Sequence, residues 1–190
     1  MLHHVGQRFC HFVVEAPEVE QETLVCMLAR GGRHGAMQLH QVFVYGTLKR
    51  GFFNYDAVLA KQEDATFVEA GTTTEAYPMF VDYYKVPYLV HRPGEGHRIV
   101  GELFSVGDAG LAALDKLEGV PGRYDRFEVD VARGSSAAAT DKAWLYAITD
   151  APLDGRTLLP DYTAAIHADY TPPGARDARL YRGWGGYEEA

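Results

Sequence analysis

Short apolar runs, bounded by glycine, proline or charged residues, recur along the chain after about residue 40. The run at residues 41–45 stops at Gly46, which is typical of a buried strand that enters a turn. Because the runs are short and separated by turn residues, we expect hairpins to join most of the strands. Runs of the same kind predict further strands at residues 66–70, 77–82, 87–91, 99–105, 127–132 and 143–149.

Two segments have the period of an amphipathic helix, which makes α+β the predicted fold class. The first begins after Asn54, a favourable N-cap, where Tyr55, Val58 and Leu59 recur at i, i+3 and i+4. The second covers residues 108–118. Several strands with only two helices predict a small curled or closed sheet, with the helices packed beside it.

The second predicted helix carries a carboxyl group on its apolar face. Asp108 can cap its start, and Gly119 suits the position after its end. Glu118 lies four residues beyond Leu114, on the buried stripe of the helix. Burial and the negative end of the helix dipole both raise the pKa of such a group, as a general base at neutral pH requires. The alternative is a last-turn glutamate in solvent beside Lys116.

The turn at residues 45–51, Tyr-Gly-Thr-Leu-Lys-Arg-Gly, is a candidate anion-binding site. A strand, a glycine-bounded turn and a helix start expose several backbone N–H groups at one place, and Lys49 and Arg50 add positive charge. A carboxylate is the expected ligand, because Phe52 follows Gly51 where a phosphate-binding P-loop has lysine. The alternative is an ordinary glycine-bounded turn.

The turn after the second predicted helix supplies further polar candidates. Tyr124 and Arg126 can hydrogen-bond a polar ligand or a neighbouring carboxylate, or they can be a structural tyrosine and a surface arginine. Asp115 is three residues before Glu118 and can pair with it. We favour a contact between Asp115 and Lys116 or water.

Composition changes near residue 40. Both cysteines, Cys10 and Cys26, come before this point, and all 12 tyrosines follow it. We therefore expect a folded domain at residues 41–190, with an irregular C-terminal segment at 151–190 and a flexible loop at 134–140. Residues 1–40 form an extension that we expect to be dispensable, with Met37 as an alternative start. Because the extension has no Cys-x-x-Cys or His-x-x-x-His pair, we predict no metal site.

Charge and hydropathy narrow the classes of partner. Eighteen Lys and Arg against 26 Asp and Glu give a net charge of −8, which repels nucleic acid. No apolar stretch approaches the ~18 residues of a membrane span. Two cysteines cannot form a disulfide framework for this length, so a reducing compartment suits the chain. We expect a cytoplasmic monomer that binds neither nucleic acid nor membrane.

Two stretches, in this order, carry a resemblance to a known family. They are residues 42–51 with Asn54, and residues 114–126, which read Leu-Asp-Lys-Leu-Glu-Gly-Val-Pro-Gly-Arg-Tyr-Asp-Arg. With residues 77–78, 86–91 and 101–104 between them, they resemble the gamma-glutamylcyclotransferase-like superfamily over about residues 42–133. The gamma-glutamylamine cyclotransferase branch is the most similar. Phe53 departs from the family, whose members often have proline there, and the extension has no recognised counterpart.

The resemblance implies a small mixed, mostly antiparallel β-barrel with flanking helices, and an enzyme without a cofactor. It implies release of 5-oxoproline and a free amine from small gamma-glutamyl amines, such as gamma-glutamyl-ε-lysine, by intramolecular aminolysis. Glu118 would be the general acid/base, and the substrate would be bound by Tyr45, Gly46, Thr47, Leu48 and Tyr124. Two alternatives remain: a cyclotransferase for other gamma-glutamyl peptides or amino acids, and a binding module of the same fold that lacks turnover.

Overall fold

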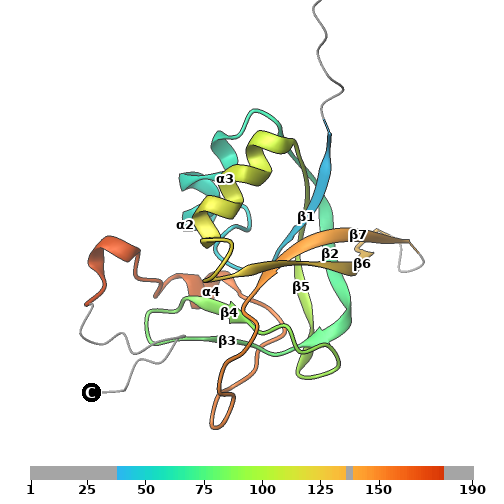
Figure 1. Cartoon of the computed structure of the whole chain (residues 1–190). Helices are drawn as coiled ribbons and strands as arrows, with labels where there is room; N and C mark the ends of the chain where they lie inside the picture. Colours follow the sequence, from blue (N-terminus) through green and yellow to red (C-terminus); the bar gives the residue numbers. More distant parts are fainter. Residues whose placement is uncertain (1–37, 136–138, 178–190) are drawn as a thin grey trace, which may run out of the picture. The chain divides into compact units, whose positions relative to one another are not determined.

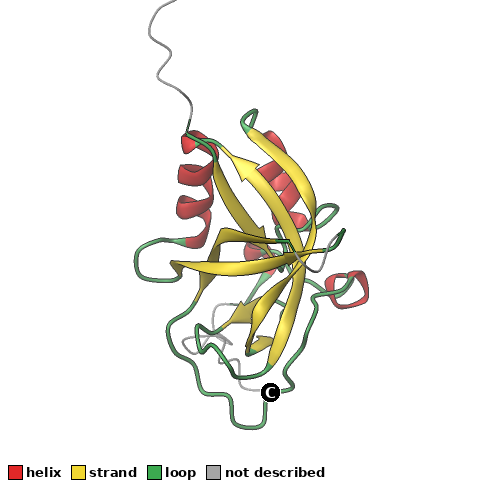
Figure 2. Ribbon diagram, turned by 90° about the vertical axis from the view of Figure 1, so that its right-hand side faces the viewer, coloured by secondary structure: helices red, strands yellow, loops and turns green. Residues whose placement is uncertain are grey.

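The computed structural model describes residues 38–135 and 139–177 (Figures 1 and 2). Most of the expected extension, and part of the expected loop at 134–140, therefore lie outside the described residues. The elements, in chain order, are β1 (His40–Val44), α2 (Phe53–Ala57), the 3₁₀ helix η1 (Leu59–Lys61), β2 (Ala65–Tyr77), β3 (Met79–Val81), β4 (Pro87–Leu89), β5 (His97–Val106), α3 (Asp108–Glu118), β6 (Asp125–Arg133), β7 (Thr140–Ala147), α4 (Ala164–His167) and the 3₁₀ helix η2 (Pro173–Ala175).

Within the described ranges, five strands close into a barrel in the order β1-β5-β2-β6-β7. The neighbours pair antiparallel, except that β1 closes the barrel by running parallel to β7, with Val42 opposite Trp144. Closure leaves no free edge on which another strand could add. The expected mixed, mostly antiparallel barrel with flanking helices is confirmed.

Successive side chains of a barrel strand point to opposite faces of the sheet, so the buried residues form two separate hydrophobic clusters. In β1, Val42 packs in one cluster with Leu114 of α3, whereas Phe43 packs in a second cluster with Leu103 and Leu145. Helix α3 lies against β5, next to η1. Its C-terminal end points toward the β3–β4 hairpin (Figure 1). This end is where the site is built.

The strand predictions are confirmed with shifted limits. Residues 66–70 are the first part of the longer β2, and residues 77–82 and 87–91 contain the short strands β3 and β4. These two strands form a separate hairpin, with Met79 opposite Leu89. Pro78 separates β3 from β2, because proline has no N–H to continue a ladder.

Both predicted side-chain caps are wrong. Phe52 is the N-cap of α2 and Gly107 is the N-cap of α3, and neither makes a side-chain cap bond. Asn54 instead lies inside α2, and its Nδ2 donates to Thr47 Oγ1 at 2.7 Å. Asp108 Oδ1 lies 2.7 Å from His40 Nε2. Both side chains therefore bind partners outside their own helix instead of making capping bonds.

Residues 151–177 contain α4 and η2, and backbone hydrogen bonds anchor this segment to the barrel. Leu159 N–H donates to the Met79 carbonyl at 2.7 Å, and Thr171 N–H donates to the Tyr84 carbonyl at 3.1 Å. Tyr162 between them is fully buried. The segment thereby forms one wall of the site.

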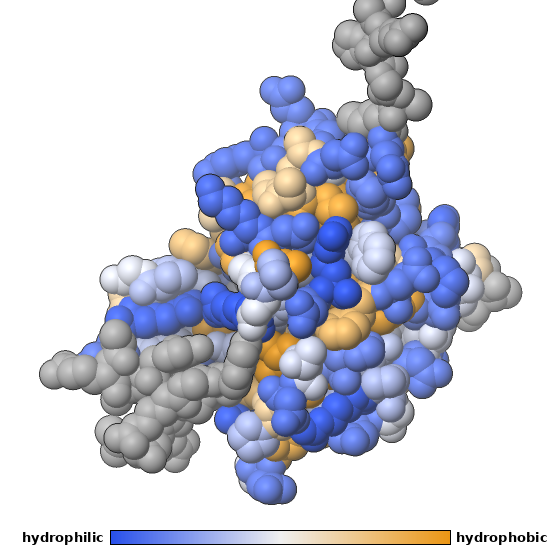
Figure 3. Space-filling view, in the orientation of Figure 1, coloured by the Kyte–Doolittle hydropathy of each residue, from blue (hydrophilic) through white to orange (hydrophobic). Residues whose placement is uncertain are grey.

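The face of the molecule drawn in Figure 3 is mainly hydrophilic, with smaller apolar patches between the polar side chains. Among the described residues, the large apolar side chains that remain exposed come from four separate segments: Leu39, Phe53, Tyr83 and Val100. None of the described helices is both long and apolar enough to cross a membrane.

Candidate functional site

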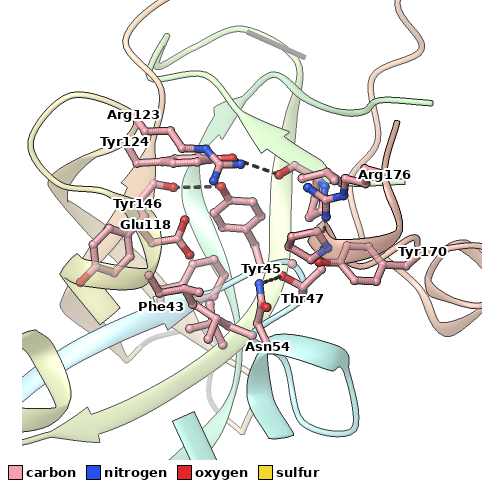
Figure 4. Close-up of a pocket in the computed structure, with 17 residues that line it drawn as sticks. Phe43, Tyr45, Thr47, Asn54, Glu118, Arg123, Tyr124, Tyr146, Tyr170 and Arg176 are labelled. Atoms are coloured by element: carbon pink, nitrogen blue, oxygen red, sulfur yellow. Dashed lines mark hydrogen bonds between the residues drawn. The ribbon is translucent and has the colours of Figure 1, made fainter. Parts of the chain in front are cut away.

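A cavity of about 170 Å³ lies between the turn after β1, the end of α3 and the C-terminal segment (Figure 4). It brings together all the predicted site residues: the turn at 45–48, Glu118 and Tyr124. The complete lining is Phe43, Val44, Tyr45, Gly46, Thr47, Leu48, Asn54, Val86, Pro87, Leu117, Glu118, Arg123, Tyr124, Tyr146, Tyr170, Pro173 and Arg176.

Hydrogen bonds to Thr47 hold the turn after β1. The Thr47 carbonyl accepts the N–H groups of Asn54 at 3.0 Å and Tyr55 at 3.1 Å. The Asn54 side chain binds the Thr47 hydroxyl, as Figure 4 shows. Within the described part of the chain, the N–H groups of Gly46, Thr47 and Leu48 donate to no acceptor. Three backbone donors at the edge of a cavity suit a carboxylate ligand.

Close packing explains the glycine of this turn. A Cβ atom added to Gly46 would lie 2.5 Å from Cγ of Pro87, at the start of β4. The turn can therefore approach β4 only where no side chain intervenes.

The variant Gly46→Ala is expected to be less stable by about 1–3 kcal/mol, because its new methyl group overlaps the Pro87 ring. Urea unfolding measures this change. Gly174→Ala is the matched control, since nothing lies within 4 Å of its added Cβ. Equal stability of the two variants would contradict the packing explanation.

The two basic side chains of the turn, Lys49 and Arg50, bind carboxylates outside the cavity. Lys49 Nζ lies 2.6 Å from Asp161 Oδ1, and Arg50 Nε lies 3.2 Å from Glu102 Oε1. Neither residue lines the cavity. The prediction that they add positive charge to the anion site is therefore wrong, because carboxylates on neighbouring segments neutralise both side chains.

Glu118 ends α3, and its carboxyl group points into the cavity (Figure 4). Gly119 ends the helix in the left-handed conformation, with φ 72° and ψ 42°. Burial raises the pKa of Glu118 to about 7, and the nearby positive charge of Arg123 partly opposes this rise. No ion pair involves Glu118 among the described side chains. The carboxyl group can therefore change protonation state near neutral pH.

Two buried tyrosines share the cavity with Glu118. Burial, together with the nearby Glu118, raises the pKa of Tyr45 and of Tyr124 well above the ordinary value. Both hydroxyls thus remain protonated donors. Tyr45 donates to the Tyr146 carbonyl at 2.9 Å, and Tyr124 donates to the Pro87 carbonyl at 3.5 Å. The longer bond leaves the Tyr124 hydroxyl the easier of the two to redirect.

Asp115 and Arg126 bind each other outside the cavity. Asp115 Oδ1 accepts the Tyr146 hydroxyl at 2.8 Å and lies 3.2 Å from Arg126 Nε. Asp115 is therefore paired with Arg126 and Tyr146 instead of Lys116, and Arg126 binds a neighbouring carboxylate, which is one of the partners expected for it. This ion pair fixes Tyr146, whose carbonyl in turn holds Tyr45.

The C-terminal wall is attached to the turn after β1 through His167. The His167 ring stacks on Phe52, with ring centroids 4.4 Å apart, and its Nε2 accepts the Phe53 N–H at 3.2 Å. Nδ1 contacts the Tyr162 hydroxyl at 3.1 Å. Burial lowers the pKa of His167, which favours the neutral ring that can accept this N–H.

Five polar lining residues were not predicted as site residues from the sequence: Asn54, which was expected only as a helix cap, Arg123, Tyr146, Tyr170 and Arg176. Arg123 precedes Tyr124 in the turn after α3, where polar site residues were expected, so its position in the sequence could have identified it as a candidate. Tyr170 and Arg176 belong to the C-terminal segment, whose sequence has no helical or strand period from which their positions could be predicted.

In the described portion of the chain, no group of three or more His, Cys, Asp or Glu residues is placed to hold a metal ion.

Comparison with known proteins defines the class of this molecule. A crystal structure of an AIG2-like protein from Mus musculus matches with a TM-score of 0.62 and 29% identity, covering 76% of this chain and 99% of the other. The sequence model of the family described as "Gamma-glutamyl cyclotransferase, AIG2-like" matches residues 42–164. The chain therefore belongs to this family, as the resemblance in its sequence implies.

Curated relatives carry related names. A gamma-glutamylaminecyclotransferase of Rattus norvegicus is 40% identical over 92 residues, which cover 47% of this chain and 62% of the relative. A putative gamma-glutamylcyclotransferase of Arabidopsis thaliana is 43% identical over 94 residues, which cover 48% and 50%. The matched region thus spans half to about two thirds of the length of these relatives.

Proposed function

We propose that this protein releases 5-oxoproline and a free amine from gamma-glutamyl amines such as gamma-glutamyl-ε-lysine. The observation that carries the proposal is a carboxyl group with a pKa of about 7, in one cavity with the backbone donors of Gly46, Thr47 and Leu48. The name of the rat relative, a gamma-glutamylaminecyclotransferase, supports the substrate class.

The turn after β1 is the proposed anchor for the glutamyl end of the substrate. The α-carboxylate of the substrate accepts hydrogen bonds from the N–H groups of Gly46, Thr47 and Leu48. Its α-ammonium group then faces Glu118 across the cavity. Binding in this folded pose brings the amine close to its own γ-carbonyl, which replaces a bimolecular encounter with a ring closure.

The proposed reaction is an intramolecular aminolysis. Ionised Glu118 removes a proton from the α-ammonium group, and the free amine attacks the γ-carbonyl carbon. A C–N bond forms to close the five-membered lactam, and the C–N bond to the leaving amine breaks. Glu118 returns its proton to the leaving nitrogen, and the second proton that the attacking nitrogen loses on becoming a lactam also passes to the leaving amine, which departs as an ammonium ion. All atoms come from the substrate, so the reaction needs no co-reactant.

The tyrosine hydroxyls are proposed to orient the reacting groups. Tyr124 OH makes only a 3.5 Å bond to Pro87 and can turn to donate to the γ-carbonyl oxygen as negative charge develops there. Tyr45 stays bound to Tyr146 and shapes the pocket beside Glu118.

Release of 5-oxoproline from a panel of substrates tests the proposal. Gamma-glutamyl-ε-lysine, glutathione and gamma-glutamylalanine are incubated with the full-length protein, and the products are quantified by mass spectrometry. We expect turnover with the highest kcat/KM for gamma-glutamyl-ε-lysine. A higher kcat/KM for glutathione would show a different substrate specificity. Binding of these compounds without release of 5-oxoproline would show that the protein is a non-catalytic binding module.

A chain that begins at Met37 is expected to keep kcat/KM within about twofold of the full-length value, because all cavity-lining residues lie between Phe43 and Arg176. Side-by-side assays of the two proteins on gamma-glutamyl-ε-lysine measure this ratio. A large loss of kcat/KM in the shorter protein, with the barrel still folded by circular dichroism, would show that residues 1–36 contribute to activity.

A further inference from the structure

Two guanidinium groups face the cavity from different walls. Arg123 lies beside Tyr124 in the turn after α3, and Arg176 lies beside Tyr170 in the C-terminal segment (Figure 4). Neither forms an ion pair with a carboxylate in the described ranges of the chain. In a chain with a net charge of −8, this cavity therefore carries more positive than negative side chains.

The two arginines are placed differently relative to Glu118. The charge of Arg123 acts on Glu118 and opposes the rise of its pKa, whereas Arg176 makes no comparable contribution. Figure 4 shows Arg176 on the opposite side of the cavity from Glu118. Arg123 thus lies near Glu118, and Arg176 lies across the cavity from it.

Arg176 is held in place by its own segment. Its Nε donates to the Thr171 carbonyl at 2.7 Å, and its Nη2 donates to the Tyr170 hydroxyl at 3.0 Å. Thr171 N–H is in turn bonded to the Tyr84 carbonyl. A guanidinium has five N–H donors, so three remain to bind an acceptor in the cavity. A planar group with fixed orientation and free donors is suited to a carboxylate.

We infer that Arg176 binds a carboxylate on the leaving amine, and that this contact makes the site select gamma-glutamyl compounds whose leaving amine is acidic. This inference rests on the proposed function. The backbone donors of the turn at 46–48 take the α-carboxylate of the glutamyl group, which leaves Arg176 for a second acidic group. Leaving amines with a terminal ammonium group in that place are disfavoured, because the guanidinium repels them.

A matched pair of substrates tests the role of Arg176. One is gamma-glutamyl-ε-lysine, and the other is the same compound with the lysine carboxylate converted to a primary amide. The full-length protein is expected to favour the acid in kcat/KM by about tenfold or more, the effect of a charge-assisted hydrogen bond. In Arg176→Gln the acid-to-amide ratio of kcat/KM is expected to fall toward one, because kcat/KM decreases for the acid and stays unchanged for the amide. Arg176→Lys is expected to restore part of the ratio.

Arg156→Gln is the matched control, because Arg156 belongs to the same C-terminal segment but does not line this cavity. Its acid-to-amide ratio is expected to stay at the wild-type value. An equal loss on both substrates in Arg176→Gln would overturn the inference, as would a wild-type ratio near one with both compounds turned over. Turnover of neither compound by the wild-type protein would instead show that the proposed function itself is wrong.

Discussion

The Glu118→Gln variant is expected to lose 5-oxoproline release by about 10²–10⁴-fold, the usual contribution of a general base. Glutamine has nearly the same shape as glutamate and cannot accept the proton of the α-ammonium group. We expect its fold to remain close to wild type, because Glu118 forms no ion pair with another described side chain. Binding of a gamma-glutamyl ligand is expected to persist, since the backbone donors of Gly46, Thr47 and Leu48 are unchanged. Initial rates and ligand binding by calorimetry measure the two properties separately.

Asp108→Asn is the control for this experiment. Asp108 is also an acid of α3, but it lies at the opposite end of the helix and does not line the cavity. Its removal is expected to leave the rate within about twofold of wild type. If Glu118→Gln released 5-oxoproline at the wild-type rate, Glu118 would have no catalytic role.

Activity is expected to fall about tenfold for each pH unit below about 7, and to level off above it, because Glu118 works as a base only when ionised. The measurement is kcat/KM for gamma-glutamyl-ε-lysine between pH 5 and 8.5. In Arg123→Gln the bend in this profile should move to higher pH, since the charge that opposes the rise of the Glu118 pKa is lost. A bend near 4.5, the ordinary value, would contradict a buried base.

The same titration affects stability. Between pH 4.5 and about 7, the folded protein keeps a proton on Glu118 that the unfolded chain releases. The folded state therefore binds more protons in this window, and the free energy of unfolding falls as pH rises through it. The fall is at most about 3.5 kcal/mol for a pKa shift of this size. Urea unfolding of Glu118→Gln should lack this component, whereas an identical pH dependence in both proteins would contradict it.

Local patterns predicted much of the fold and some of the residues that line the cavity. The strands follow from apolar runs, and the limits of α3 follow from its apolar period and from Gly119. Glu118 was found because a helical period fixes which face a side chain occupies. The turn after β1 was found because glycine and its neighbours determine where backbone N–H groups are exposed.

Long-range contacts account for the predictions that failed. The partners of Lys49 and Arg50 are Asp161, 112 residues away, and Glu102, 52 residues away. No local pattern encodes such pairs. Arg176 was missed for the same reason, since its place in the cavity depends on how the C-terminal segment packs on Tyr84. A segment without a hydrophobic period gives no signal in the sequence for where its side chains lie, so the tertiary structure is needed to place them.

The fate of the γ-carbonyl carbon in ¹⁸O-enriched water tests the central claim most directly. The full-length protein is incubated with gamma-glutamyl-ε-lysine, and the products are analysed by mass spectrometry. Ring closure by the substrate's own amine yields 5-oxoproline and lysine in equal amounts, with no ¹⁸O in the lactam. Glutamate with ¹⁸O in its γ-carboxyl group would show attack by water instead, and would contradict the intramolecular reaction proposed for Glu118.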